Sequence, residues 1–154
     1  MKERYKIIRC GQLYDGVSAE WKPGQSILVD GGRIAAVGAQ VPEPENALEI
    51  DLRDCQVTPG MIDAHMHMDY IDWHTVREEV YTTSEEAKTL AIARCARMAL
   101  ARGFTTVRHV GGITSNGYGV LDVKEAVERG YLPGARIVAA PVFLCTAGSH
   151  GDLS

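Results

Sequence analysis

The sequence predicts an α/β protein in two parts, a strand-rich segment over residues 1–58 and an alternating strand–helix segment over residues 59–154. Two observations predict this division. Short apolar, β-branched runs separated by turn residues fill the first segment, whereas strand patterns alternate with two amphipathic helical patterns in the second. Alternation of this kind is typical of parallel strands joined by right-handed helical crossovers.

The first segment is expected to contain short strands and a hairpin. Strands are expected over residues 5–9, 26–29, 33–38 and 48–52, where apolar and β-branched residues gather. Residues 30–32 (Asp-Gly-Gly) tolerate positive φ and stand between two of these strands, which is the signature of a hairpin. Residues 41–46 are polar and contain two prolines, so they predict a loop.

The second segment begins after Pro59-Gly60, and residues 61–68 predict its first strand. Ser84 is followed by two glutamates, so it is expected to cap a helix that ends at Gly103. The remaining elements are expected strands over residues 104–108 and 136–140, a helix over 120–129 and a loop over 142–154.

Charge and composition exclude several classes of protein. Lys+Arg is 16 and Asp+Glu is 20, which gives a net charge of −4 and no cationic face for nucleic acid. No run approaches the roughly 20 apolar residues that a membrane span needs, and no apolar segment follows the charged N-terminus as in a secretory signal. We therefore expect a cytoplasmic protein that binds neither membrane nor nucleic acid. The four widely separated cysteines form no Cys-x-x-Cys pair, as expected for ordinary thiols.

Residues 61–69 form the one stretch that indicates chemistry. Side chains alternate between the two faces of a strand, so this stretch is expected to have one apolar and one polar face. The apolar face would carry Ile62, Ala64, Met66 and Met68, and the polar face Asp63, His65, His67 and Asp69. Both faces of a strand in a βα array are normally covered, and two covered imidazoles are costly unless something binds them. Neutral imidazole is a preferred ligand of zinc-like ions. A polar strand with two solvated histidines is the alternative, because His-x-His also occurs by chance.

Residues 58–67 (Thr-Pro-Gly-Met-Ile-Asp-Ala-His-Met-His) resemble the first-strand signature of the amidohydrolase superfamily. Residues 11–16 and 27–38 resemble the small β-sandwich that precedes the barrel in that superfamily, and residues 103–112 and 134–140 resemble the second and third barrel strands. These later motifs resemble the imidazolonepropionase-like branch, which includes prolidase-type dipeptidases. The resemblance implies an N-terminal composite β-sandwich segment over 1–58. For residues 59–154 it implies an incomplete (β/α)8 TIM-type barrel that consists of the first three βα units.

The resemblance also implies a site. His65 and His67 would ligate the more buried of one or two divalent metal ions, with zinc the first candidate. His150 resembles the histidine of a Gly-Gly-His-Gly loop, so it either faces the substrate or is a solvated loop histidine. The family position of His109 is usually an aspartate, which leaves its role open between structure and site. Asp63 either orients a ligand or caps a turn.

The function implied is metal-dependent hydrolysis of amide, peptide or cyclic amide carbon–nitrogen bonds through a metal-activated water, in a small-molecule or dipeptide substrate. A full barrel takes about 250 residues, and the later ligands of the family would follow residue 154. We therefore expect an N-terminal fragment, inactive alone, of an enzyme that is a homo-oligomer when full length. The alternative is a non-catalytic truncated module, or a subunit that needs a separate C-terminal chain. No catalytic proton-transfer residue is assigned within this sequence.

Overall fold

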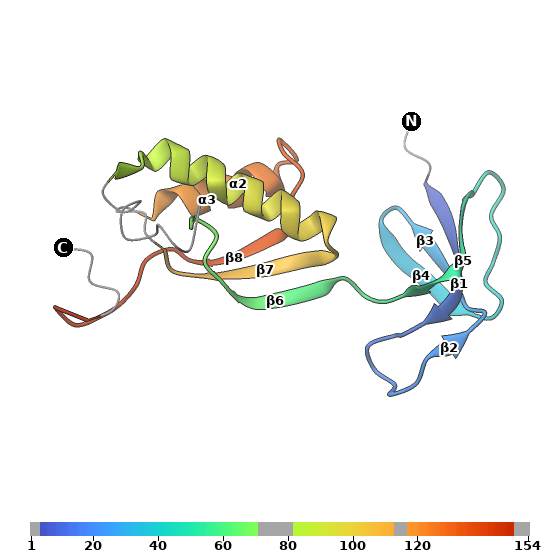
Figure 1. The fold of residues 1–154 in the computed structure, drawn as a ribbon. Helices are drawn as coiled ribbons and strands as arrows, with labels where there is room; N and C mark the ends of the chain where they lie inside the picture. Colours follow the sequence, from blue (N-terminus) through green and yellow to red (C-terminus); the bar gives the residue numbers. More distant parts are fainter. Residues whose placement is uncertain (1–3, 71–81, 113–116, 150–154) are drawn as a thin grey trace. The chain divides into compact units, whose positions relative to one another are not determined.

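The computed structural model describes residues 4–70, 82–112 and 117–149. The chain divides into two compact units, residues 1–59 (unit 1) and residues 60–154 (unit 2). Figure 1 shows that unit 1 is built from strands and that unit 2 carries helices on a sheet. No helix among the described residues is long and apolar enough to cross a membrane. The mixed α/β class expected from the sequence is confirmed.

Unit 1 is a sheet centred on its first strand. Its strands are β1 (Tyr5–Leu13), β2 (Lys22–Pro23), β3 (Ser26–Asp30), β4 (Arg33–Gly38) and β5 (Leu48–Val57). β2 and β3 pair antiparallel with successive parts of β1, β4 pairs antiparallel with β3, and β5 runs parallel to β1. Cys10, Leu13 and Ile27 are buried at its core.

The hairpin expected between β3 and β4 is confirmed. Asp30 pairs with Arg33, and both intervening glycines have positive φ, at 57° and 89°. β1 and β5 are each longer than expected from the sequence. The reason lies at Gly11, where the register of the β1–β5 pair shifts between Cys10 and Gln12. A Cβ at Gly11 would collide with the Arg53 carbonyl, so this glycine permits close backbone pairing rather than ending the strand.

Asp15 organises the turn that leads from β1 to β2. Its Oδ1 accepts hydrogen bonds from the backbone N–H groups of Val17 and Ser18, at 2.9 and 2.8 Å, and its Oδ2 pairs with Lys22 Nζ at 2.6 Å. The Lys22 ammonium, followed by the two backbone N–H groups, holds the pKa of the Asp15 carboxyl far below its usual range. The turn is thus stabilised by the ionised form of this side chain.

This lowered pKa makes the stability of unit 1 dependent on pH. A carboxyl whose pKa is depressed on folding contributes stability that is present above its unfolded pKa of about 3.9. That contribution is lost as pH falls through the lower folded value. Unfolding in urea can be followed by the NMR signals of the β1 amides. The urea concentration at the midpoint should fall as pH is lowered from 6 to 3, and it should fall less in Asp15→Asn than in the wild type. Asparagine keeps an acceptor for the turn but has no charge. Identical pH profiles for the two proteins would contradict this role of Asp15.

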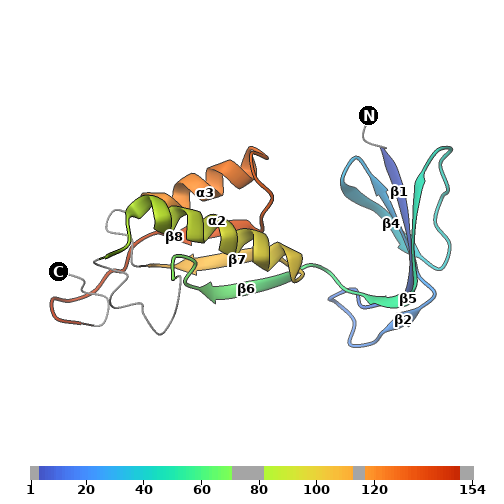
Figure 2. The same cartoon turned by 45° about the horizontal axis from the view of Figure 1, so that its top comes forward.

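Unit 2 is a parallel three-stranded sheet with two helices. Its elements are β6 (Met61–Met66), α2 (Glu85–Ala101), β7 (Phe104–Val110), α3 (Tyr118–Glu128) and β8 (Arg136–Ala140). The described strands lie in the order β6-β7-β8, all parallel. Figures 1 and 2 both show α2 and α3 on the same face of this sheet. This is the expected strand–helix alternation with parallel strands.

The helices of unit 2 begin and end largely where the sequence predicts. Ser84 is the N-cap of α2, and its side chain accepts a hydrogen bond from the Ala87 N–H at 3.2 Å. Gly103 follows the helix with a φ of 90°, a conformation that favours glycine. α3 begins two residues before the expected start. The core between helices and sheet consists of fully or nearly fully buried side chains, including Ile92, Ala96, Val107, Val120 and Ile137.

Candidate metal centre

The strict alternation expected over residues 61–68 is wrong, and β6 ends at Met66. Asp63 pairs with Val107 and Met66 pairs with His109, so three steps along β6 match two steps along β7. This extra residue is a β-bulge. Val107 and His109 lie on one face of β7 and are fully buried, and paired residues of parallel strands point to the same face. Asp63 and Met66 therefore share a face, contrary to the expected pattern.

Two further residues depart from the expected faces. Ile62, expected on a covered apolar face, is 69% exposed. Asp69, expected on the polar face, is completely buried next to the buried Met68. The alternation pattern alone could not predict these positions. Ile62 lies where the register already shifts between the Met61–Phe104 and Ile62–Thr106 pairs. Asp69 lies beyond the end of β6, where strand alternation no longer applies.

Asp63 holds the bulge. Its Oδ1 accepts a hydrogen bond from the backbone N–H of His65 at 3.0 Å. Bulges next to functional sites commonly re-aim one side chain. The sequence left two roles open for Asp63, orienting a ligand or capping a turn. The structure shows a side-chain contact to the backbone of His65, which fixes the chain at that residue.

His67 lies just beyond β6 and its ring is fixed by the loop that follows β7. Its Nδ1 is 2.7 Å from the Gly111 carbonyl oxygen. A carbonyl only accepts, so Nδ1 carries the proton and the neutral ring has its lone pair on Nε2. The His65 ring is adjacent, with centroids 5.4 Å apart and planes at 79°. This arrangement suits a metal ligand, because ligating histidines generally donate their second N–H to an outer acceptor.

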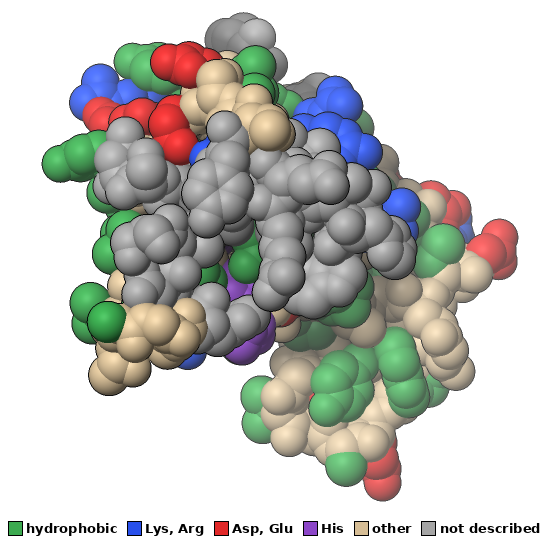
Figure 3. All heavy atoms as spheres, turned by 60° about the vertical axis from the view of Figure 1, so that its left-hand side comes forward, with side chains coloured by type: hydrophobic (Ala, Val, Ile, Leu, Met, Phe, Trp, Pro, Cys, Tyr) green, Lys and Arg blue, Asp and Glu red, His purple; other side chains and the backbone are tan. Residues whose placement is uncertain are grey.

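Aromatic side chains and a constrained glycine surround His67. The Tyr70 ring stacks on it at 5.0 Å between centroids, and the Phe143 ring lies at 5.8 Å. Gly111, which supplies the carbonyl, has a φ of 101°, and a Cβ there would strike the Phe143 ring. Histidine side chains reach the surface on the face shown in Figure 3. No separate role for Gly111, Tyr70 or Phe143 was predicted from the sequence.

His109 is the penultimate residue of β7 and is completely buried. Its Nδ1 accepts a hydrogen bond from the Met68 N–H at 3.2 Å. Burial lowers the pKa of His109, with the nearby Asp69 carboxylate acting in the opposite direction and His67 adding to the decrease. His109 is therefore a neutral ring that contacts the segment next to His67.

The described residues contain no group of three or more His, Cys, Asp or Glu side chains arranged to hold a metal ion. What the structure brings together is a pair, His65 and His67. His150, the expected substrate-facing residue, lies outside the described residues. Two imidazoles supply part of a coordination shell, because metal sites of this type use three or four protein ligands.

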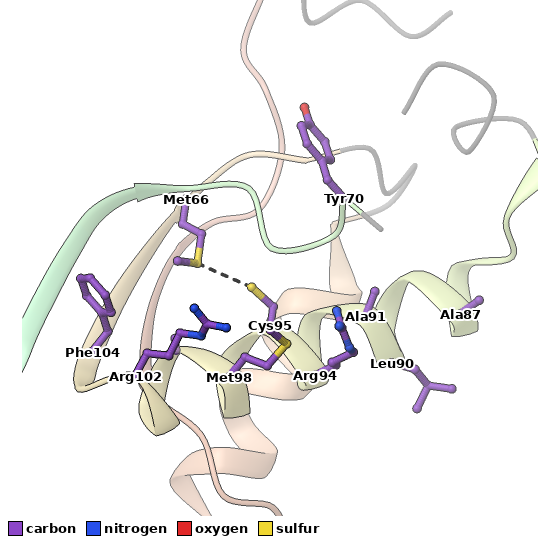
Figure 4. Close-up of a pocket in the computed structure, with 11 residues that line it drawn as sticks. Met66, Tyr70, Ala87, Leu90, Ala91, Arg94, Cys95, Met98, Arg102 and Phe104 are labelled. Atoms are coloured by element: carbon purple, nitrogen blue, oxygen red, sulfur yellow. Dashed lines mark hydrogen bonds between the residues drawn. The ribbon is translucent and has the colours of Figure 1, made fainter. Parts of the chain in front are cut away.

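A separate open groove of about 770 Å³ lies between β6 and α2. Figure 4 shows Met66, Tyr70 and Phe104 on one side and Arg94, Cys95, Met98 and Arg102 from α2 on the other. Cys95 Sγ lies 3.7 Å from Met66 Sδ, and burial raises the pKa of the Cys95 thiol. The groove is on the helix side of the strand, so it is distinct from the His65–His67 pair even though Tyr70 borders both.

Comparison with known proteins assigns the family. The sequence model of the amidohydrolase family matches residues 56–152, which include the bulged strand and both histidines. The chain belongs to the amidohydrolase family. The match covers more than half of this sequence, and it confirms the superfamily that the first-strand motif resembled.

Similar proteins of this family are enzymes. A dihydroorotase of Anaeromyxobacter sp. (strain K) is 34% identical over 83 residues, which cover 54% of this chain and 16% of that protein. A solved Xaa-Pro dipeptidase with bound methionine is 30% identical with a TM-score of 0.83, covering 96% of this chain and 36% of that one. A prolidase complexed with N-methylphosphonate-L-proline is 26% identical with a TM-score of 0.74, covering 88% and 31%. The chain thus spans about a sixth of the curated relative and about a third of the solved structures.

Proposed function

We propose that this chain supplies the first-strand ligands of a metal-dependent hydrolase that acts on carbon–nitrogen bonds. The observation that carries this proposal is the His67 ring, whose Nδ1–H is held by the Gly111 carbonyl so that Nε2 is available to a metal. Membership of the amidohydrolase family and the hydrolases among its similar proteins support the reaction class.

His65 and His67 would hold the divalent ion, with zinc the first candidate and a second ion in the complete site. Such an ion, when bound, polarises a substrate carbonyl and lowers the pKa of water to about 7. The residues of this chain position the ligands: Asp63 fixes the backbone at His65 through its 3.0 Å hydrogen bond, and Gly111 fixes the His67 tautomer. Tyr70 and Phe143 place aromatic rings beside His67, with the Tyr70 ring stacked on the imidazole.

The proposed architecture follows from the same comparisons. Residues 1–58 would form part of a composite β-sandwich, and residues 59–154 the first three βα units of a (β/α)8 barrel. The open three-stranded parallel sheet and the likeness to about a third of the Xaa-Pro dipeptidase chain support this proposal. Barrel active sites lie at the C-terminal ends of the strands, which is where His67 and His109 are found. The remaining ligands would come from later strands, and His150 would face the substrate.

A dipeptide is the first substrate class to test. Of the solved relatives, one is a dipeptidase named for Xaa-Pro substrates and another binds a proline phosphonate, and both align with nearly all of this chain. Dihydroorotate is the second, since the curated relatives are dihydroorotases.

Metal removal tests the proposal. We expect this chain, joined or co-expressed with the segment that supplies the later ligands and loaded with Zn²⁺, to hydrolyse Xaa-Pro dipeptides or dihydroorotate. Dialysis against a chelator should lower the rate at least about a hundredfold, because the metal supplies several kcal/mol of transition-state stabilisation. Adding Zn²⁺ or Mn²⁺ should restore it.

Two results would contradict the proposed function. Hydrolysis that survives complete metal removal would show that the histidine pair is not a metal site. The second result is a Zn²⁺-loaded protein that hydrolyses neither substrate class, even with a co-expressed C-terminal chain. That result would show that the chain is a non-catalytic module.

A further inference from the structure

The C-terminal end of β7 contacts the segment around His67 at two points. The His67 Nδ1–H donates to the Gly111 carbonyl at 2.7 Å, and the Met68 N–H donates to His109 Nδ1 at 3.2 Å. Residues 109 and 111 therefore hold neighbouring residues of the same segment, one through a ring nitrogen and one through a carbonyl. The metal-ligand role proposed for His65 and His67 leaves His109 without a function.

The contact to Met68 fixes the tautomer of His109. A backbone N–H only donates, so His109 Nδ1 bears the lone pair and the neutral ring carries its proton on Nε2. That Nε2–H has no hydrogen-bond partner among the described residues, and the ring is completely buried. A ring in this state has no lone pair left for a metal. His109 and His67 are thus opposite tautomers, although their segments touch.

Burying a polar ring with one unsatisfied N–H costs stability, and an apolar side chain of similar size would avoid that cost. An apolar side chain would, however, leave the Met68 N–H unsatisfied at a buried position next to His67. His109 therefore stabilises the fold through its Nδ1 atom, which accepts the hydrogen bond from the Met68 N–H.

We propose that His109 is a positioning residue for the candidate metal centre. Through Nδ1 it anchors the Met68 amide and so keeps His67 within reach of the Gly111 carbonyl, which sets the His67 tautomer. A positioning role for His109 rests on the proposed function, because it presupposes a metal centre. The hydrogen bonds that carry the role are present without metal. His109 itself does not bind the metal.

The test is NMR of the ¹⁵N-histidine-labelled protein, in which ring ¹⁵N shifts report the tautomer. In the metal-free wild type we expect His67 in the Nδ1–H form and His109 in the Nε2–H form. In His109→Gln the acceptor lies at the position of Nε2 instead, so we expect the His67 signals to average between tautomers. The Zn²⁺ affinity of the same protein should fall about tenfold or more, the usual effect of losing an outer contact to a ligand.

Two variants serve as controls. His109→Asn places its Oδ1 near the position of Nδ1, so it should restore the His67 tautomer and bring the Zn²⁺ affinity to within about threefold of the wild type. Val107→Ala removes packing two residues earlier on the same buried face. It should lower the unfolding midpoint and leave the His67 tautomer unchanged, which separates positioning from general stability.

The outcomes distinguish the two proposals. An Nδ1–H signal from wild-type His109, or a His67 spectrum unchanged in His109→Gln, would overturn the positioning role. Loss of the His109 Nε2 proton on Zn²⁺ addition would show that it is a ligand and would overturn it as well. Zn²⁺ that perturbs neither His65 nor His67 would overturn the proposed function, while the metal-free tautomers would still test the role of His109.

Discussion

His67→Asn is expected to abolish specific metal binding while leaving unit 2 folded. The asparagine Nδ2–H₂ can still donate to the Gly111 carbonyl, which His67 Nδ1 contacts at 2.7 Å. The side chain lacks the Nε2 lone pair that would bind the ion. Losing an outer contact to a ligand already costs about 10- to 100-fold in affinity, so losing the ligand should cost at least a hundredfold. Calorimetric titration with Zn²⁺ measures the affinity, and any metal-dependent hydrolysis should fall with it.

His67→Ala is the matched comparison. It removes the ligand and the hydrogen bond together and leaves the Gly111 carbonyl without its donor. We expect the same loss of Zn²⁺ binding as in His67→Asn, plus about 1 kcal/mol lower free energy of unfolding. If His67→Asn bound Zn²⁺ as tightly as the wild type, His67 would not be a ligand. If the two variants were equally stable, the Gly111 contact would not stabilise the loop.

Much of unit 2 could be predicted from its sequence because its signals are local. The Ser84 cap, the glycine after α2 and the apolar periodicity of both helices each depend on residues within one or two turns. The hairpin at residues 30–33 is local in the same sense. The His65–His67 motif also identified the end of the strand that carries the candidate centre.

The features that the sequence did not predict depend on contacts between residues far apart in the chain. The bulge in β6 arises from its pairing with β7, about 43 residues later in the chain, and no alternation pattern reveals it. The tautomers of His67 and His109 are set by Gly111 and Met68, each of which lies more than 40 residues away from the ring it contacts. The continuation of β1 through Gly11 was not predicted, because the approach of β5 cannot be seen from the sequence of β1 alone.

Gly112→Ala is the other substitution with a large expected effect. A Cβ at Gly112 would collide with the Asp69 carboxyl group, and Asp69 is completely buried. The carboxyl is enclosed on all sides, so it has no open space to swing into, and its neighbour Met68 is buried as well. Overpacking of this kind typically costs about 1–3 kcal/mol. We expect a loss at the upper end of that range, seen as faster hydrogen exchange of the β7 amides, with the β1 amides of unit 1 as internal reference.

The cause of that loss can be isolated with a double-mutant cycle. Asp69→Ala removes all the atoms with which the new Cβ would collide. It carries its own cost, because Asp69 interacts with its surroundings, but the cycle subtracts that cost. If the collision is the cause, Gly112→Ala should cost much less in the Asp69→Ala background, with a coupling energy of about 1–2 kcal/mol. An additive cycle would show that the loss comes from contacts of the new methyl group other than the Asp69 carboxyl, because the backbone at Gly112 does not adopt a positive φ that would itself exclude alanine.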